Sequence, residues 1–382
     1  MRTVLISGAG VAGATLAYWL GRHGFRTTVV EQSQGVRSSG NPVDVRDAAL
    51  PITESMGVLD NLRQYATRAT DVAVLDATGR RIAAMPGGPN SDKPTSGAAG
   101  LGEVELLRSD LARVLLDACS DAELIFDDSI TELSEDENGV DVALTSGQQL
   151  RFDLVIGADG VHSATRRMIF GPEQQFVTHL GMYVGTVPVD LEVADGDAVQ
   201  LYNAPGRLAA LHPARGQTGA AFIFRHPQLP DGELRDAQRQ KKLIMDSYAG
   251  DGWILPQLLE RVRDTEDLYF DAVSRIDLPS WSRGRVGLVG DAASSVSLLG
   301  DGSTKAIIGA HILAEELSRS NDHRIAFRRY QERHQPSISS PRQVRLSAAV
   351  MVPATAPGLA VRNAALRVVD RVLRLRRRRA TA

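Results

Sequence analysis

Near the start of the chain, the spacing of the apolar residues changes from a continuous run to a helical repeat and then back to a continuous run. This pattern predicts a strand, a helix and a second strand. Residues 3–6 form an apolar run with β-branched members, which is typical of a buried parallel strand. Residues 14–22 carry their apolar side chains on one face of a helix. A second β-branched run, residues 27–30, ends at Glu31. Together they predict one β–α–β unit.

Two later segments repeat the buried-strand pattern, and a β-rich stretch lies between them. Residues 152–157 and 285–290 are short apolar runs, and residues 304–317 have helical periodicity. Short strands at near-regular spacing predict a separate antiparallel sheet: residues 183–188, 199–202, 208–212 and 219–224. Further strands are expected at residues 72–76, 81–83, 124–126, 139–145 and 269–276, and helices at 111–119, 238–248 and 254–262. The pattern therefore predicts an α/β fold with an inserted antiparallel layer.

Length and composition narrow the class of protein. The chain has 382 residues and a formal net charge of −3, so we expect about two domains and no affinity for nucleic acid. Its one cysteine, Cys119, excludes an intramolecular disulfide and a CxxC metal site, and its apolar helical setting predicts a packed thiol. We find no signal peptide and no apolar run of about 20 residues. We therefore expect a cytoplasmic protein without stable membrane association and without a metal site.

The turn between the first strand and helix has the composition of a dinucleotide site. Gly8 permits a tight turn, Gly10 lets a pyrophosphate approach the backbone, and Gly13 lets helix and strand pack closely. Ala12 lies in the same turn, and the helix start offers N–H groups to phosphates. Glu31 can accept hydrogen bonds from ribose hydroxyls. This unit alone does not separate FAD from NAD(P).

Two more strand ends carry Gly and Asp. Asp159 and Gly160 follow the strand at 152–157, and Asp291 follows the strand at 285–290. In an open α/β sheet, ligands bind beyond the carboxyl ends of the strands. Three such ends in one chain suit one large ligand that lies across the sheet edge.

With these three motifs in this order, the chain resembles the class A FAD-dependent monooxygenases, the family of aromatic hydroxylases and tetracycline-inactivating oxygenases. The resemblance covers nearly the whole chain. It implies a Rossmann-like FAD-binding domain of the GR2 type, an inserted antiparallel-sheet substrate domain and C-terminal helices. It also implies tightly bound, non-covalent FAD. The expected divisions are residues 1–72, 100–175 and 277–320 for the FAD-binding domain, 73–99 and 176–276 for the substrate domain, and 321–382 for the C-terminal helices.

Several charged residues have both a cofactor role and a simpler alternative. Arg108, just before a helix, can meet a pyrophosphate, or it can pair with Glu105 or Asp110. Arg46 resembles the family arginine that faces FAD and the entering nicotinamide, and its alternative is a solvated charge at a strand end. Asp291 can accept from a ribityl hydroxyl or cap the following turn.

Some residues in the loop after the second strand end are expected to hold the loop in place, and some to contact the cofactor. We expect Asp159 to hold this loop first and to contact the cofactor second. His162, in the same loop, is expected to be a hydrogen-bonding residue rather than a catalytic base.

The segment before the helix at 304–317 should bring backbone N–H groups to the flavin pyrimidine edge. Its candidate residues are Gly300, Gly302, Ser303 and Thr304. Lys305 follows them, and we expect it to point to solvent. The chain departs from the family pattern nearby, because Ser294 and Ser295 stand where His-Pro is common and Leu298 where a proline is common.

The resemblance implies a reaction as well as a cofactor. NAD(P)H, with NADPH favoured, would bind transiently and reduce FAD, O2 would add at flavin C4a, and the hydroperoxide would transfer one oxygen atom. The substrate would be an aromatic, polycyclic or polyketide-like small molecule, with hydroxylation as the default outcome. The alternatives are an FAD oxidase or dehydrogenase on the same fold, or a non-catalytic flavin-fold protein that binds a ligand.

The sequence names no catalytic base and only provisional substrate contacts. Candidate lining residues are Tyr183, Tyr202, His212, Phe222 and Phe224, and core packing is the alternative for each. The arginine-rich stretch 371–379 could contact anionic lipid or nucleic acid, but we expect a solvated helix end. The protein is expected to be a monomer or a weak dimer.

Overall fold

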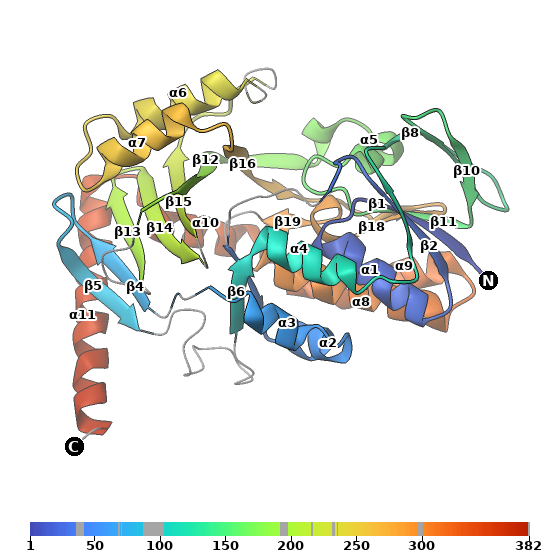
Figure 1. Cartoon of the computed structure of the whole chain (residues 1–382), viewed down its shortest axis with the longest axis horizontal. Coiled ribbons are helices and arrows are strands. Elements are labelled where there is room, and N and C mark those ends of the chain that lie inside the picture. Colours follow the sequence, from blue (N-terminus) through green and yellow to red (C-terminus); the bar gives the residue numbers. More distant parts are fainter. Residues whose placement is uncertain are drawn as a thin grey trace.

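The first expected strand lies inside a six-stranded sheet with the order β17-β18-β11-β1-β2-β7 (Figure 1). The structure is a computed structural model that describes the chain except for residues 36–41, 68, 70, 87–102, 192–197, 215–216, 231–233, 235, 297–300 and 381–382; the side chains of 86, 214, 217, 296 and 376–380 are also outside the description. The strands are β1 (Thr3–Ser7), β2 (Arg26–Glu31), β7 (Glu123–Phe126), β11 (Leu154–Gly157), β17 (Ser282–Arg283) and β18 (Val286–Leu288). All described pairings in this sheet are parallel except β17 with β18.

Alternate residues of these strands pack against two different layers, because successive side chains along a strand point to opposite faces of the sheet. Val4 and Ile6 of β1 pack with helices, whereas Leu5 between them packs against a three-stranded antiparallel sheet. The helices are α1 (Val11–Arg22), α4 (Arg108–Asp117), α8 (Gly302–Arg319) and α9 (His323–His334). The small sheet consists of β8 (Ile130–Glu135), β9 (Val140–Leu144) and β10 (Gln149–Phe152). Burial on both faces explains the nearly continuous apolar runs in the sequence.

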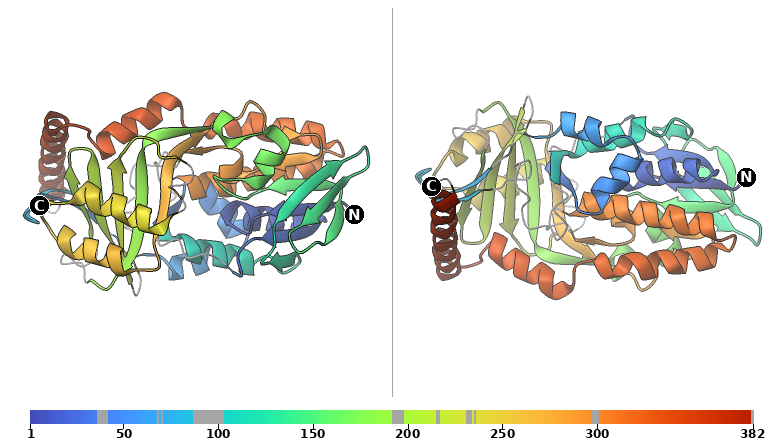
Figure 2. Two further views of the ribbon diagram at one scale, coloured as in Figure 1. Left: turned by 90° about the horizontal axis from the view of Figure 1, so that it is seen from above. Right: turned by 90° about the horizontal axis from the view of Figure 1, so that it is seen from below.

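A second, eight-stranded sheet stands beside this layer, with the order β19-β16-β12-β15-β14-β13-β4-β5 (Figures 1 and 2). Its strands are β4 (Asp71–Leu75), β5 (Arg81–Pro86), β12 (Val177–Val189), β13 (Ala198–Ala204), β14 (Arg207–Ala214), β15 (Gln217–Arg225), β16 (Tyr269–Ile276) and β19 (Ser295–Val296). Helices α6 (Ala237–Tyr248) and α7 (Leu255–Asp264) cover one face, and α10 (Pro341–Met351) contacts the other. The sheet is therefore buried on both faces over much of its area.

Short elements complete the chain between and around these sheets. A two-stranded ribbon pairs β3 (Pro42–Arg46) with β6 (Glu103–Leu107). The remaining helices are α2 (Ala49–Ser55), α3 (Leu59–Gln64), α5 (Ala164–Phe170) and α11 (Ala356–Ala380), with 3-10 turns η1 (Glu173–Gln175), η3 (Gly290–Ala292) and η4 (Gln335–Ser337). Within the described residues no single helix is long and apolar enough to cross a membrane, whereas one bent pair, His323–Met351 with Ala356–Leu375, meets that test by length and composition only.

Most expected elements are confirmed, and several differ in extent or pairing. The eight-stranded sheet is not wholly antiparallel, because β13 pairs with β4 in parallel. The run at 152–157 is two strands that meet at Asp153, whose carboxylate accepts hydrogen bonds from Thr3. The helix expected at 304–317 begins at Gly302, and the helix expected at 111–119 begins at Arg108.

Candidate functional site

The glycines of the first turn have three different environments, and each suits the task expected from the sequence. Gly8 has φ +106°, and an added Cβ there would lie 2.6 Å from the carbonyl oxygen of Ala158. An added Cβ at Gly13 would collide with the carbonyl oxygen of Gly8. At Gly10 an added Cβ would meet no described atom within 4 Å. The turn is thus closed around its first and third glycines and open at the second.

The acidic residue that ends β2 is fixed beside this turn. One carboxylate oxygen of Glu31 accepts from the backbone N–H of Ala9 at 2.9 Å, and the other accepts from the N–H of Ser33 at 3.0 Å. Gly10 is the N-cap of α1, and no side chain caps this helix. The two carboxylate oxygens of Glu31, both hydrogen-bond acceptors, therefore lie near the N-terminus of α1. Backbone N–H groups are unsatisfied there, and the helix dipole is positive.

Asp159 holds its own loop, as expected. Its carboxylate accepts from the Ser163 hydroxyl at 2.5 Å and from both the N–H and the hydroxyl of Thr165 at 2.9 Å. Ser163 in turn caps α5 by accepting from the N–H of Arg166 at 2.9 Å. These bonds fix the direction in which α5 leaves the strand end.

Arg166 joins the second strand end to the third. Its side chain is fully buried and donates to the carbonyl oxygens of Val161 at 2.6 Å and of Ala292 at 3.2 Å. Glu173 lies 3.6 Å from the same guanidinium. Burial lowers the pKa of Arg166, and the carboxylates of Glu173 and Asp159 oppose that shift. The sequence reasoning assigned no role to this residue, although an arginine three positions after an N-cap serine is a signal that could have marked it.

Arg108 contacts the third strand end rather than the partners considered from sequence. Its guanidinium lies 3.8 Å from the carboxylate of Asp291, and both side chains are partly exposed. Asp291 lies within η3 and does not cap it, so the capping alternative is excluded. Burial and then the charge of Asp271, to which the Tyr269 hydroxyl donates at 3.3 Å, raise the pKa of Tyr269; Arg108 lowers it and Asp291 raises it by smaller amounts. Tyr269, on β16 of the eight-stranded sheet, was not anticipated from the sequence.

The start of α8 is tied to the ribbon. The Thr304 hydroxyl donates to the carbonyl oxygen of Asp44 at 2.9 Å and accepts from the N–H of Arg46 at 3.1 Å. Gly302 and Ser303 lie in the first turn of the same helix, whereas Gly300 is outside the described residues. The structure therefore brings Arg46 and Thr304 together.

The ribbon carries a cluster of carboxylates that sequence reasoning did not identify. Asp44 lies opposite Glu105 and Arg46 lies opposite Glu103 in the β3–β6 register. Arg46 is 3.6 Å from Glu103 and 3.9 Å from Asp44, so it is an ion-paired group rather than a solvated charge. Burial, reinforced by the two neighbouring carboxylates, raises the pKa of Asp44, and burial also raises that of Glu103. This arrangement favours one proton held between Asp44 and Glu103.

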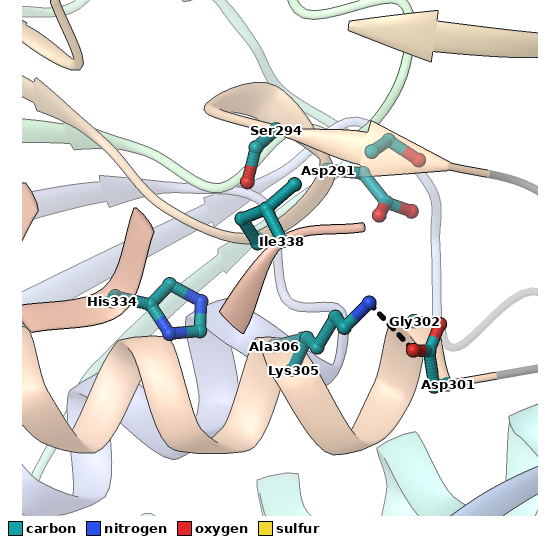
Figure 3. A pocket seen from close by; sticks show the side chains of 10 residues that line it. Asp291, Ser294, Asp301, Gly302, Lys305, Ala306, His334 and Ile338 are labelled. Atoms are coloured by element: carbon teal, nitrogen blue, oxygen red, sulfur yellow. Dashed lines mark ion pairs between the residues drawn. The ribbon is translucent and has the colours of Figure 1, made fainter. Parts of the chain in front are cut away.

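A small polar pocket opens between the third strand end and α8 (Figure 3). It is lined by Gly290, Asp291, Ser294, Ser295, Asp301, Gly302, Lys305, Ala306, His334 and Ile338. Lys305 was expected in solvent, but its ammonium group lies 2.5 Å from Asp301 and donates to the Ser339 hydroxyl at 3.0 Å. The expectation was wrong because the carboxylate four residues earlier holds the lysine in the pocket. Burial, together with the charge of Lys305, lowers the pKa of His334 to about 4.

Of the five aromatic candidates for substrate contact, four lie in one core cluster under α6 and α7. Tyr183, Tyr202, Phe222 and Phe224 are buried there with Ile244 and Leu258 among others. This is the core-packing alternative. Because strand side chains alternate, they point away from the face that carries His212.

His212 is the remaining candidate, and it contacts the ribbon. Its Nε2 lies 3.1 Å from a carboxylate oxygen of Glu105, and among the described residues its buried Nδ1 has no hydrogen-bond partner. The buried Thr186 hydroxyl is likewise without a partner in the described part of the chain. In the strand register, Thr186 lies opposite Ala221, and Ala221 lies opposite Ala210. His212 follows two residues after Ala210 on the same strand. The side chains of Thr186 and His212 therefore share one face of the sheet. Tyr269 lies opposite Thr186 in the β12–β16 register, so it shares this face.

His162 is a loop hydrogen-bonding residue, as expected, and it also joins two sheets. Its Nδ1 lies 2.9 Å from Glu173 and its Nε2 3.2 Å from Asp271 of β16. These hydrogen bonds, from Asp271 first and then from Glu173, raise the pKa of His162 to about 10. The imidazolium thus carries a positive charge between two carboxylates and is not free to act as a base.

Comparison with known proteins identifies the family. The model of the FAD binding domain family matches residues 1–323. The chain belongs to the class A FAD-dependent monooxygenases. A flavin-dependent monooxygenase of Legionella longbeachae is 35% identical over 338 residues, which are 86% of this chain and 83% of that one. An uncharacterised protein of Mycobacterium tuberculosis is 40% identical over 338 residues, 86% of this chain and 89% of that one. The crystal structure of the tetracycline destructase Tet(51) superposes with a TM-score of 0.80 at 29% identity, and the match covers 98% of this chain and 97% of that one.

The residues of this monooxygenase fit FAD. The turn is open at Gly10, so a ligand can approach the backbone there, and this place is an uncapped helix N-terminus that favours phosphate. Glu31 offers carboxylate oxygens beside it, and Arg108 and Asp291 offer a donor fork and an acceptor at the third strand end. The Cys119 thiol takes no part, because it is buried and donates to the carbonyl oxygens of Ala14 and Leu115.

Proposed function

We propose that this monooxygenase consumes NAD(P)H and O2 and hydroxylates an aromatic, polycyclic or polyketide-like small molecule. The observation that carries the proposal is the meeting of three strand ends with one face of the eight-stranded sheet. Arg166 joins the second strand end to the third, and His162, which follows the second strand end, lies 3.2 Å from Asp271 of the eight-stranded sheet. Such a site offers a cofactor on one side and an organic molecule on the other.

FAD, when bound, would supply hydride acceptance and oxygen activation, and the chain would supply position and electrostatics. Gly10 and the start of α1 would hold the pyrophosphate, Glu31 the adenosine ribose, and Asp291 with Arg108 the central part of the cofactor. Gly8, Ala12 and Gly13 would shape the turn, and Gly302, Ser303 and Thr304 would present N–H groups from the first turn of α8. Arg46 would add a positive charge where NAD(P)H approaches, with NADPH favoured.

The domain organisation that we infer follows the two large sheets. Residues 1–72, 100–175 and 277–320 would form a GR2-type Rossmann-like domain, with the β8–β10 sheet inside its second segment. Residues 73–99 and 176–276 would form the inserted substrate domain, and residues 321–382 the C-terminal helices. The contact of His162 with Asp271 of the eight-stranded sheet and that of His212 with Glu105 of the ribbon support close docking of these domains.

The substrate would lie on the face of the eight-stranded sheet that carries His212 and Thr186. Their unpartnered polar atoms suit the hydroxyl and carbonyl oxygens of a polycyclic phenol, because a buried polar atom without a partner gains free energy from a ligand that satisfies it. Tet(51), by its name, acts on a molecule of that class, a tetracycline.

The test begins with the purified protein loaded with FAD. Aromatic and polycyclic phenols are screened for faster NADPH oxidation, and the product is analysed after reaction under isotopically labelled O2. Label in the product supports the proposal. Full turnover without label in the product would identify an oxidase or dehydrogenase on this fold. A bound flavin that NADPH never bleaches, with any ligand, would identify a ligand-binding protein.

A further inference from the structure

The last helix, α11, has three faces of different character. It runs along the edge of the eight-stranded sheet, and its C-terminal part extends past the sheet (Figure 1). One face holds the helix to the protein: Arg362 donates to the Asn203 side chain at 2.8 Å, and Leu366 and Leu373 on the same face are partly buried. This face fixes the helix orientation, so the other two faces are presented to the outside.

The second face is an exposed apolar stripe. Val361, Val368, Val372 and Leu375 are 71%, 63%, 43% and 53% exposed. Together with Ala365, these four residues are spaced alternately by four and three positions along the sequence. All five side chains therefore lie along one side of the helix. Single exposed apolar residues are ordinary, but a continuous strip along a helix is a feature of interaction surfaces.

The third face is basic and borders the apolar stripe. The exposed Arg367, Arg371 and Arg374 follow one another at spacings of four and three residues. The sequence of α11 contains eight arginines and one acidic residue, a net charge of +7, whereas the whole chain carries −3 and the remainder therefore −10. The single acid, Asp370, is paired with Arg374 at 2.7 Å.

We propose that α11 docks this protein reversibly on an anionic lipid bilayer surface. An amphipathic helix with arginines beside an apolar strip lies in the plane of a membrane interface, with its apolar side in the acyl boundary and its cations near the headgroups. The proposal replaces the expectation of a solvated helix end. It is independent of the reaction, because no residue of the exposed strips belongs to the candidate site.

Two other occupants fit the surface less well. Nucleic acid would pair with the arginines but gives no reason for a strip of valines. A second copy of the chain would cover the valines, but it would bring two helices of charge +7 together without acidic partners on either strip.

The experiment measures sedimentation of the FAD-loaded protein with vesicles of pure phosphatidylcholine and with vesicles in which phosphatidylserine replaces a third of it. Wild type should bind the second kind, and added salt should weaken binding. The double variant Arg367→Glu/Arg371→Glu should bind more weakly by well over a factor of about thirty, since each arginine lost near an anionic surface costs about a factor of five and each glutamate gained adds repulsion. The control Arg261→Glu/Arg328→Glu makes the same charge change at exposed positions of α7 and α9 and should bind like wild type.

A second variant separates lipid from the other occupants. Val368→Ser/Val372→Ser keeps every charge and should lower vesicle binding about tenfold, while NADPH oxidation with soluble substrate stays unchanged. Equal binding to both kinds of vesicle, or wild-type binding by the arginine variant, would overturn the proposal. Salt-sensitive binding to duplex DNA that is unaffected by the valine changes would assign the helix to nucleic acid. A dimer that the valine changes dissociate, without vesicle binding, would assign it to self-association.

Discussion

The guanidinium of Arg166 donates to the carbonyl oxygen of Ala292 at 3.2 Å, although the two residues follow different strands of the parallel sheet. The arginine is fully buried and also donates to Val161 in its own loop. A buried donor that satisfies two main-chain oxygens fixes the distance between the loops that carry them. The spacing between the loops of Asp159 and Asp291 therefore depends on this side chain.

Replacing Arg166 by methionine should lower the free energy of unfolding by roughly 2–5 kcal/mol. The change removes the charge and leaves the carbonyl oxygens of Val161 and Ala292 without donors. Denaturant unfolding of the FAD-free protein measures the decrease. The neighbouring Arg167→Gln is the matched control: its side chain is 45% exposed and pairs with the same Glu173, so a decrease of less than about 1 kcal/mol is expected. Equal decreases in both variants would contradict the role given to Arg166.

The first turn offers a pair of variants with opposite consequences. Gly10→Ala should change stability by less than about 1 kcal/mol, because an added Cβ meets no described atom. It should nevertheless weaken FAD binding about tenfold or more, since the methyl group occupies the open side of the turn. Gly13→Ala should instead destabilise the protein by about 1–3 kcal/mol through collision with Gly8. Flavin fluorescence and thermal unfolding measure the two effects. Unchanged FAD affinity in Gly10→Ala would remove the pyrophosphate from this turn.

Local pattern was sufficient to predict the strand ends of the site. The runs that became β1, β11 and β18 are short, apolar and followed by Gly or Asp, and this signal does not depend on distant residues. The role of Asp159 was also predictable, because Asp, Ser and Thr within a few residues bond locally.

Contacts between layers were not predictable from the same information. The alternatives for Arg108 were nearby carboxylates, yet it contacts Asp291, which is distant in sequence. The aromatic candidates show a second limit. Both faces of the eight-stranded sheet are covered, so its strands are apolar on both sides and alternation does not reveal which face has the polar residues of the candidate site.

The contacts of His162 predict a pH dependence of stability. Its pKa is raised from the ordinary 6.5 to about 10 by Asp271 and Glu173. The folded protein therefore binds more protons than the unfolded chain between these values. The stabilisation is fully present below pH 6.5 and is lost as the pH rises toward 10. His162→Gln should flatten this alkaline limb, whereas Arg167→Gln should leave it intact; thermal unfolding across the pH range measures both. Parallel profiles for wild type and His162→Gln would contradict the assignment.

Substitutions on the two faces of the eight-stranded sheet should separate activity from stability. His212→Phe removes the imidazole nitrogens that we place beside the substrate, and kcat/KM should fall roughly tenfold to hundredfold. Its stability should change by less than about 2 kcal/mol, because the substitution removes the hydrogen bond between the imidazole and Glu105 and keeps a ring of similar size. Phe222→Ala, on the opposite face, should lower the free energy of unfolding by about 3–5 kcal/mol. At temperatures where it stays folded, its kcat/KM should be close to wild type. Steady-state kinetics with the substrate found by the phenol screen, together with denaturant unfolding, gives both quantities for each variant. If His212→Phe retained full kcat/KM while Phe222→Ala became inactive without unfolding, the substrate would have to lie on the face beneath α6 and α7.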